Sequence, residues 1–226
     1  MSENSSLWYF ENVDLFQLLC PAKTGNMEEN HQVATFKKGE YIYFPEEPAN
    51  KIYLIEEGRI RIGTFLEDGK ESVKAILSAG EIFGELALTG EVRRTDFAQA
   101  MDDGTKACIM DIEEMKELMA ENRDLSFKII KLMGLRLKKL ERKVESLVFK
   151  DSRTRVIEFL HEAAIWKGKK IGYETLISTR LTHKDIASLT GTSRQTVTTI
   201  LNELKEKNIL TFDRKRILIR DLGMLK

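Results

Sequence analysis

The sequence predicts an α+β protein in which an antiparallel β-barrel or jelly-roll precedes a long helix and a C-terminal winged helix-turn-helix. Three patterns predict this order. Short apolar runs separated by glycine turns occupy residues 33–112, an apolar heptad repeat occupies 130–147, and two short helical patterns joined by a glycine occupy 182–204. Because 226 residues lie near the upper end of the single-domain range, we expect the chain to divide into domains.

The first pattern is typical of antiparallel strands. Each apolar run is four or five residues long, and turn residues that include glycine stand between the runs. Asp68-Gly69 and Asp103-Gly104 are typical of tight hairpin turns, so we expect a hairpin at each. The expected strands are Tyr41–Phe44, Ile52–Ile55, Ile60–Gly63, Val73–Leu77, Phe97–Ala100 and Ala107–Met110.

A helical period begins after Asp111, first in a short helix over 112–119 and then in a longer one. Apolar residues of the longer helix alternate at spacings of three and four, which is a coiled-coil seam. A helix that packs only on its own domain usually carries a wider apolar stripe. The narrow seam favours a partner helix and a homodimer, and packing within the chain is the alternative. The expected dimer interface is Ile130, Met133, Leu137, Leu140, Val144 and Leu147.

The seam is interrupted at 149–152, where Asp151 or Ser152 can cap a new helix over 153–166 that ends before Gly168. The charge changes at the same place. Residues 149–226 hold 16 Lys and Arg against 9 Asp and Glu, a net charge of +7, and the remainder of this neutral chain carries −7. This asymmetry favours a second module that meets a polyanion.

A helix-turn-helix is expected within that basic half. Thr182 and Asp185 have the spacing of a capping box, Gly191 suits the turn, and Ser193 can cap a second helix from Arg194 to Leu204. Two apolar segments, 209–212 and 216–219, predict a small hairpin wing with a basic tip.

The exposed face of the second helix predicts DNA recognition. Arg194 can read guanine and Gln195 can read adenine in the major groove, and both stand in the first turn, which meets base edges. Short hydroxyl side chains and a lysine at the wing tip suit phosphate contacts. The expected DNA-binding residues are Thr182, Ser193, Arg194, Gln195, Thr196, Thr198, Thr199 and Lys215.

Several other classes of protein are disfavoured. No stretch approaches the roughly eighteen apolar residues of a membrane span, and the polar start lacks signal-peptide character, so we expect a cytoplasmic protein without a membrane partner. Cys20 and Cys108 are too few for a thiolate metal site, and we expect both to behave as small buried apolar residues. The three histidines are scattered. Since no nucleophile–base pair, zinc motif or phosphate loop with lysine is present, we expect neither an enzyme nor a bound metal.

Three segments make the chain resemble the Crp/Fnr family of bacterial transcription regulators: Phe83–Leu88, Arg93–Thr95 and Ser193–Val197. The resemblance covers nearly the whole chain. It implies a homodimeric, sequence-specific DNA-binding regulator, with RNA polymerase as a further partner. The implied domains are a cyclic-nucleotide-binding-like β-roll sensor at 1–120, a dimerisation helix at 121–148 and a winged helix-turn-helix DNA-binding domain at 149–226.

The resemblance also implies an effector site in the sensor. In family members that bind cyclic AMP, a Gly-Glu-Leu segment and a downstream Arg-Ser/Thr-Ala segment hold the ligand. Carried over by motif, Glu85 would accept from a ribose hydroxyl, while Arg94 and Thr95 would donate to the phosphate. The implied effector-binding residues are Gly84, Glu85, Leu86, Arg94 and Thr95.

Three departures count against cyclic AMP. Asp96 stands where that pattern has alanine, the segment from Gly84 to Arg94 is one residue shorter, and Leu140 and Glu141 replace the adenine-binding hydroxyl pair. A cyclic nucleotide is therefore the less favoured effector, and the identity of the effector stays unknown. The alternatives are another small ligand, or no ligand with Glu85 and Arg94 as a structural ion pair.

The second helix of the motif also departs from relatives of the cyclic-AMP receptor type. Those relatives read DNA with Arg-Glu and a second Arg, whereas Arg194, Gln195 and Thr199 stand here. We therefore expect a related palindrome with a shifted core. An alternative function is a ligand sensor or scaffold that acts through protein contacts without DNA, but the Arg194-Gln195 surface and the basic wing argue against it.

Overall fold

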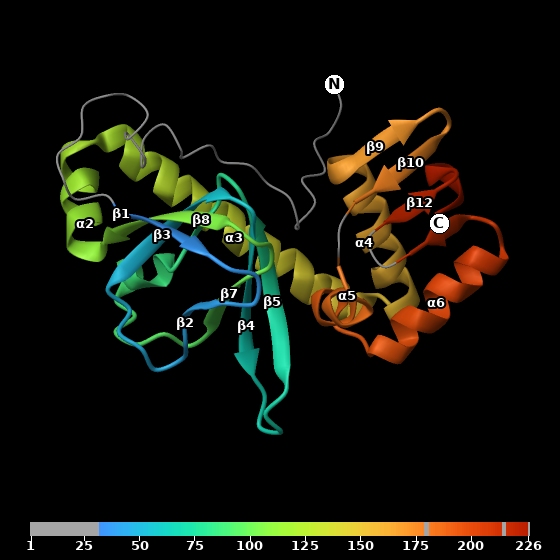
Figure 1. Cartoon of the computed structure of the whole chain (residues 1–226), viewed down its shortest axis with the longest axis horizontal. Helices are drawn as coiled ribbons and strands as arrows, with labels where there is room; N and C mark the ends of the chain where they lie inside the picture. Colours follow the sequence, from blue (N-terminus) through green and yellow to red (C-terminus); the bar gives the residue numbers. More distant parts are fainter. Residues whose placement is uncertain (1–31, 179–180, 214–215, 226) are drawn as a thin grey trace. The chain divides into compact units, whose positions relative to one another are not determined.

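The computed structural model describes residues 32–178, 181–213 and 216–225, apart from the side chain of Trp166. The described residues form two compact units (Figure 1). The division between them falls between Arg136 and Leu137. These two residues belong to one helix, α3 (Arg123–Phe149), so each unit takes part of it.

The described part of the first unit is built on two antiparallel four-stranded sheets, in the order β1-β8-β3-β6 and β2-β7-β4-β5. All six expected strands are present, and β1 and β6 are additional. The strands are β1 (Gln32–Phe36), β2 (Tyr41–Tyr43), β3 (Lys51–Glu57), β4 (Arg59–Phe65), β5 (Glu71–Ser78), β6 (Ile82–Phe83), β7 (Phe97–Ala100) and β8 (Thr105–Asp111). The predicted α+β class, with a β-roll at the N-terminal side, is confirmed.

One of the two expected hairpins is correct. Gly69 has a φ of +76° in the turn that joins the paired strands β4 and β5. Gly104 also has a positive φ, but the hairpin predicted there is wrong because β7 and β8 belong to different sheets. Both glycines lie in turns, as their neighbours in sequence predict, whereas strand pairing is decided by the packing of distant segments.

The first part of α3 covers an apolar cluster of this unit, together with α2 (Ile112–Glu121). Leu125, Ile129 and Leu132 recur at helical spacing and are buried in one cluster with Met115. Cys108 of β8 lies in the same cluster, in agreement with its expected behaviour as a small apolar residue. Cys20 lies outside the described residues.

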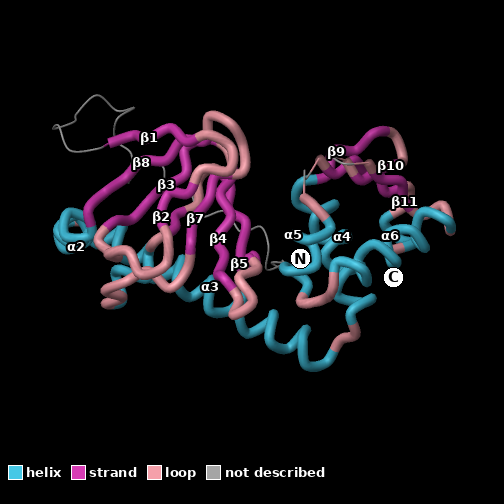
Figure 2. The backbone as a smooth tube through the Cα atoms, turned by 60° about the horizontal axis from the view of Figure 1, so that its bottom comes forward, coloured by secondary structure: helices cyan, strands magenta, loops and turns pink. Residues whose placement is uncertain are grey.

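After α3, the described residues of the second unit form three α-helices, a short 3₁₀ helix (Leu222–Met224) and a four-stranded antiparallel sheet in the order β11-β12-β10-β9. Figure 2 shows these helices and strands along the backbone. The expected helix-turn-helix with its wing is present. The elements are α4 (Ser152–Lys167), β9 (Gly168–Ile171), β10 (Glu174–Ile177), α5 (His183–Thr190), α6 (Arg194–Glu206), β11 (Leu210–Phe212) and β12 (Ile217–Ile219).

The wing consists of the paired strands β11 and β12, with Phe212 opposite Ile217. Its expected basic tip, Arg214-Lys215, lies outside the described residues. The expected contact of Lys215 with DNA therefore stays a prediction.

Local sequence explains how α4 begins and ends. The Asp151 side chain accepts a hydrogen bond from the backbone N–H of Thr154 at 2.7 Å, so Asp151 is the N-cap. Gly168 ends the helix with an ordinary negative φ of −75°. Glycine is required there because the backbone of residue 168 lies close to that of Ala164, and a Cβ would lie 2.1 Å from the carbonyl oxygen of Ala164.

Candidate DNA-binding surface and sensor site

Helix α6 separates an apolar face from a polar one. Its buried side chains recur at helical spacing and are Val197, Ile200, Leu201 and Leu204. Arg194, Gln195 and Thr199 are exposed on the other face, and Thr196 and Thr198 are half-buried. The helix therefore presents its first turn and one further residue to a partner, while its apolar face holds it in the fold.

The turn before α6 has the geometry that the sequence predicts. Thr182 and Asp185 form a reciprocal capping box at the start of α5, and Gly191 ends that helix with a φ of +63°. Ser193 caps α6 by accepting a hydrogen bond from the backbone N–H of Thr196 at 3.0 Å. The two helices of the motif are thus defined by side chains next to the turn.

Four hydroxyl groups of this surface differ in what they can still donate. Thr182 Oγ1 donates to Asp185 Oδ2 at 2.7 Å, and Thr198 Oγ1 donates to the Arg194 carbonyl at 2.9 Å. Ser193 and Thr196 share a single hydrogen across 2.8 Å, which leaves their pair one hydrogen for an outside acceptor. Of these four residues, Ser193 and Thr196 are the ones that keep a donor for phosphate in this conformation.

Arg155 is a residue of this unit that the sequence interpretation missed. From α4 its guanidinium donates to the carbonyls of Thr190 and Gly191 at 2.8 and 2.9 Å, and to that of Lys150 at 2.6 Å. It therefore links the end of α3 to the turn of the helix-turn-helix. An arginine within an amphipathic helix carries no local signal of such a contact.

The seam of α3 is largely exposed. Ile130, Leu137, Leu140 and Val144 have exposed fractions of 60–63%, and Leu147 has 43%. Met133 is the exception, because it is half-buried against the apolar cluster of the first unit. A Cβ on Gly191 would lie 2.5 Å from Leu147, so the end of the seam also reaches the turn of the DNA-binding motif.

The five implied effector residues begin at a tight turn. Gly84 has a φ of +76°, and a Cβ there would lie 2.9 Å from the Lys51 carbonyl oxygen and 3.0 Å from Arg94 Nη1. Glycine is needed here for both conformation and space. Glu85 and Leu86 follow in a short 3₁₀ helix (Glu85–Thr89), where Leu86 is 42% exposed.

Arg94 is 2% exposed and points into the protein. Its guanidinium donates to the Gly84 carbonyl at 3.0 Å and to the Lys51 carbonyl, and it lies 4.6 Å from the centre of the Tyr43 ring. Its Nε is buried without a hydrogen-bond partner among the described residues. The chain itself therefore engages both terminal nitrogens of the expected phosphate-binding arginine, and Nε is the one guanidinium nitrogen without a partner among the described residues.

Glu85 pairs with Arg136 of α3, not with Arg94 as the structural alternative supposes. Arg136 is half-buried, and loss of hydration lowers its pKa from the ordinary arginine value. Thr95 donates its hydroxyl to Glu91 at 2.9 Å. Since the sequence contains many candidate cations, only the packing of α3 on the sheet identifies the partner of Glu85.

Asp96 adds a second carboxyl group near this site. It accepts a hydrogen bond from the Tyr43 hydroxyl at 3.3 Å and lies 3.8 Å from Lys74 Nζ. Burial raises the pKa of Asp96, and the Lys74 charge opposes that change. Glu91 and Asp96 thus place two carboxyl groups near the position expected for a phosphate.

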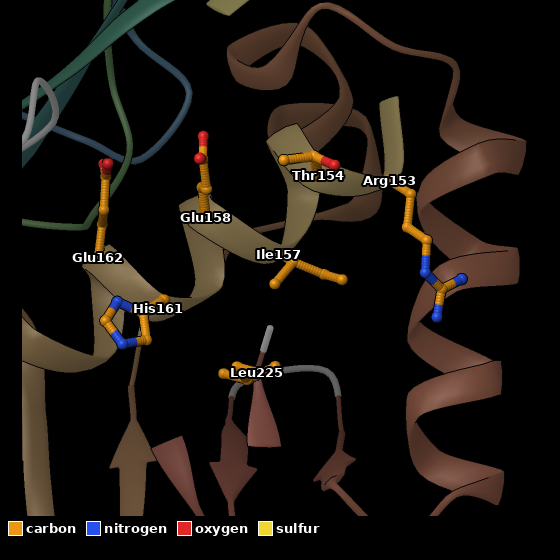
Figure 3. A pocket seen from close by; sticks show the side chains of 7 residues that line it. All are labelled: Arg153, Thr154, Ile157, Glu158, His161, Glu162 and Leu225. Carbon is orange, nitrogen blue, oxygen red and sulfur yellow. The ribbon is translucent and has the colours of Figure 1, made fainter. Parts of the chain in front are cut away.

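A cavity of about 330 Å³ lies along α4 in the second unit (Figure 3). Glu158 and Glu162 point to the same side of the helix there. Glu162 is 4% exposed, and burial raises the pKa of Glu162 to about 8, with the neighbouring Glu158 charge as a further cause. The lining residues are Arg153, Thr154, Ile157, Glu158, His161, Glu162 and Leu225.

Neither a cluster of metal ligands nor a membrane-spanning helix is found in the described ranges. Within 32–178, 181–213 and 216–225, no group of three or more His, Cys, Asp and Glu side chains could hold a metal ion. In the same part of the chain, no helix is both long and apolar enough to cross a membrane.

Comparisons with known proteins cover both units. A family model described as a cyclic nucleotide-binding domain matches residues 33–122, and one described as a Crp-like helix-turn-helix domain matches residues 154–226. A solved structure of a CooA mutant from Carboxydothermus hydrogenoformans has a TM-score of 0.76 and 31% identity, covering 92% of this chain and 93% of that chain.

Curated relatives are similar over comparable lengths. A CRP-like cAMP-activated global transcriptional regulator of Mycobacterium tuberculosis is 27% identical over 207 residues, which are 92% of this chain and 92% of the relative. A Global nitrogen regulator of Nostoc sp. is 28% identical over 188 residues, which are 83% of this chain and 84% of the relative. The similarity therefore includes the first unit, α3 and the second unit.

Proposed function

Since the chain belongs to the Crp/Fnr family of bacterial transcription regulators, we propose that it binds operator DNA as a homodimer through the exposed face of α6. One observation carries this assignment: the first turn of α6 exposes Arg194 and Gln195 while the opposite face of the helix is buried. A recognition helix meets base edges with this turn. The family consists of regulators, so no catalytic role is assigned to any residue.

The contacts can be divided by chemistry. Arg194 reads guanine and Gln195 reads adenine, because their side chains can each form paired hydrogen bonds to those bases. Thr199 lies next along the exposed face, and the Ser193–Thr196 pair donates to a phosphate with its remaining hydrogen. Thr182 and Thr198 act through the fold, since their hydroxyl hydrogens are used within it. We expect Lys215, which lies outside the described residues, to contribute a further phosphate contact.

Dimerisation through α3 supplies a second copy of α6, so that the protein can contact both half-sites of the operator. The exposed seam of Leu137, Leu140 and Val144 supports this arrangement, because a partner helix would remove three apolar side chains from water. A two-fold dimer reads a palindrome with half-sites about one helical turn apart. We expect the regulator to act in the cytoplasm and to affect RNA polymerase at promoters.

The sensor takes a small effector other than cyclic AMP. Arg94 and Thr95 already donate to acceptors of the chain, and Glu91 and Asp96 place carboxyl groups nearby, so a cyclic phosphate would lose contacts and meet negative charge. Arg94 Nε is buried and has no hydrogen-bond partner among the described residues. Native mass spectrometry of the purified protein, with and without cyclic AMP, measures both the dimer mass and any bound small molecule. Stoichiometric retention of cyclic AMP would overturn this part of the proposal.

Substitution of Arg194 tests the base-reading assignment. We expect Arg194→Ala to weaken binding to the preferred operator by about 1–3 kcal/mol, while binding to random duplex changes much less. Fluorescence anisotropy with both duplexes measures the difference. Lys116→Ala, which removes one exposed charge from α2, is the control and leaves both affinities unchanged. An equal loss on both duplexes would reject base reading by Arg194.

A further inference from the structure

His183 lies between three parts of the proposed DNA-binding surface. It is the first residue of α5, its Nδ1 lies 2.9 Å from Thr198 Oγ1 of α6, and its ring makes an edge contact with Phe212 of β11 at a centroid distance of 5.6 Å. The half-buried imidazole is thus next to the recognition helix and the wing, and it joins them to the first helix of the motif.

The hydrogen bonds specify how the ring can be protonated. Thr198 Oγ1 has one hydrogen and lies 2.9 Å from both the Arg194 carbonyl and His183 Nδ1, so the tautomer that satisfies both contacts is the one in which His183 Nδ1 donates to Thr198. The other ring nitrogen, Nε2, then carries the lone pair of the neutral form. It can take up a proton without disturbing the link to Thr198.

The charged neighbours determine when this proton is taken up. Desolvation lowers the pKa of His183, and the Arg194 charge on α6 lowers it further. On α5 itself Lys184 is exposed and Asp185 is engaged in the capping box, while Lys205 of α6 lies over the Phe212 ring at 5.6 Å. Without DNA the imidazole is therefore neutral near pH 7.

We propose that His183 is a proton-dependent phosphate contact that takes up a proton when operator DNA binds. This rests on the proposed function, because the phosphates would come from the duplex that α6 and the wing engage. Their negative charge favours the imidazolium form, so binding strengthens as the pH falls. The same contact acts on every sequence, since a phosphate carries no base identity.

The test compares the full-length wild-type dimer with two His183 variants on a palindromic duplex selected from a random library and on a random duplex. From about pH 8 to pH 6, we expect wild-type affinity to rise by up to about tenfold per subunit on both duplexes. The salt slope should steepen by about one for each subunit. His183→Gln should show neither change, and His183→Arg should bind tightly with a flat profile at both pH values.

His161→Gln is the matched control, because it removes a histidine of α4 and should keep the wild-type pH response. Glu162 titrates in part of the same pH range and affects both proteins. The decisive quantity is therefore the difference between wild type and His183→Gln in how much DNA affinity changes with pH. If His183→Gln keeps the full wild-type response, the proposal is overturned. If wild type binds neither duplex at any pH, the proposed DNA-binding function fails instead. Circular dichroism shows whether His183→Gln is folded, and His183→Arg gives an independent readout if it is not.

Discussion

Among single residues, burial gives two polar side chains roles that their sequence positions do not reveal. Glu162 is one of them. Its pKa of about 8 in the folded protein lies above the ordinary value of 4.5, so the folded state holds the proton more tightly than the unfolded chain. Its contribution to stability is therefore fully present below about pH 4.5 and is lost as the pH rises through 8.

Replacement of Glu162 by glutamine should remove this pH dependence of the free energy of unfolding. We expect Glu162→Gln to raise the free energy of unfolding near pH 8.5 by on the order of 3 kcal/mol, with little effect near pH 5. Urea unfolding at both pH values measures the difference. Glu158→Gln is the control on the same face of α4 and should give a smaller change, because Glu158 is paired with Lys150. Equal stabilisation by Glu162→Gln at both pH values would show that Glu162 does not lose its proton between them in the folded protein.

Arg94 is the second residue, and its substitution separates a structural role from a ligand-binding one. Arg94→Met leaves the carbonyls of Gly84 and Lys51 without their buried donor, so we expect the ligand-free protein to lose about 2–4 kcal/mol of stability. Arg93→Met is the matched control and should cost less than about 1 kcal/mol because Arg93 is exposed. Urea unfolding measures both. An unchanged stability for Arg94→Met would show that the unliganded fold does not need this side chain.

Between elements, the joint of α3 and α4 connects the proposed dimer helix to the DNA-binding motif. Arg155 donates to carbonyls on both sides of this joint, and Leu147 packs against Gly191. These contacts hold the helix-turn-helix in a defined orientation relative to the end of α3. In a two-fold dimer, that orientation determines which half-site spacing both recognition helices can occupy.

Loss of Arg155 should therefore loosen the spacing requirement. We expect Arg155→Met to reduce the preference for the correct spacing over a spacing one base pair longer by about 1 kcal/mol, while affinity for a single half-site is retained. Fluorescence anisotropy titrations measure the affinities for three duplexes: one with the correct spacing, one with a spacing one base pair longer, and one with a single half-site. Lys169→Met in β9 is a control that removes a charge of the same unit outside the joint. An unchanged spacing preference in Arg155→Met would reject the role of the joint.

For the molecule as a whole, we expect assembly to depend on the apolar seam that the single chain leaves exposed. Leu137 and Val144 are each 60% exposed. We expect the double variant Leu137→Glu and Val144→Glu to be monomeric at micromolar concentration and to bind the palindrome at least about tenfold more weakly, since charges at seam positions oppose pairing. Sedimentation velocity and anisotropy measure the two effects.

The control for the dimer variant is Val92→Glu, which changes an 80% exposed apolar residue outside α3. It should keep both the dimer and the affinity for the palindrome. A double variant that stays dimeric would show that other surfaces hold the two copies together. A wild-type protein that is monomeric at the same concentration would reject the dimer proposal itself.

The class of fold, most strands and the helix-turn-helix with its caps can be predicted from the amino-acid sequence. These features depend on residues close together in the chain: the period of apolar side chains, the capping box at Thr182 and the turn at Gly191. Two features of the sheets are not predicted in this way. The β9–β10 hairpin has weak apolar alternation, and the turn at Gly104 joins strands of different sheets instead of forming a hairpin.

Contacts between side chains far apart in the chain are known only from the folded protein. Arg136 reaches Glu85, Arg155 links the end of α3 to the turn after α5, and His183 contacts Thr198 on the recognition helix. Local sequence patterns report which face of an element is apolar, because burial follows the helix or strand period. They do not report which polar group lies opposite, because that depends on how separate elements pack together.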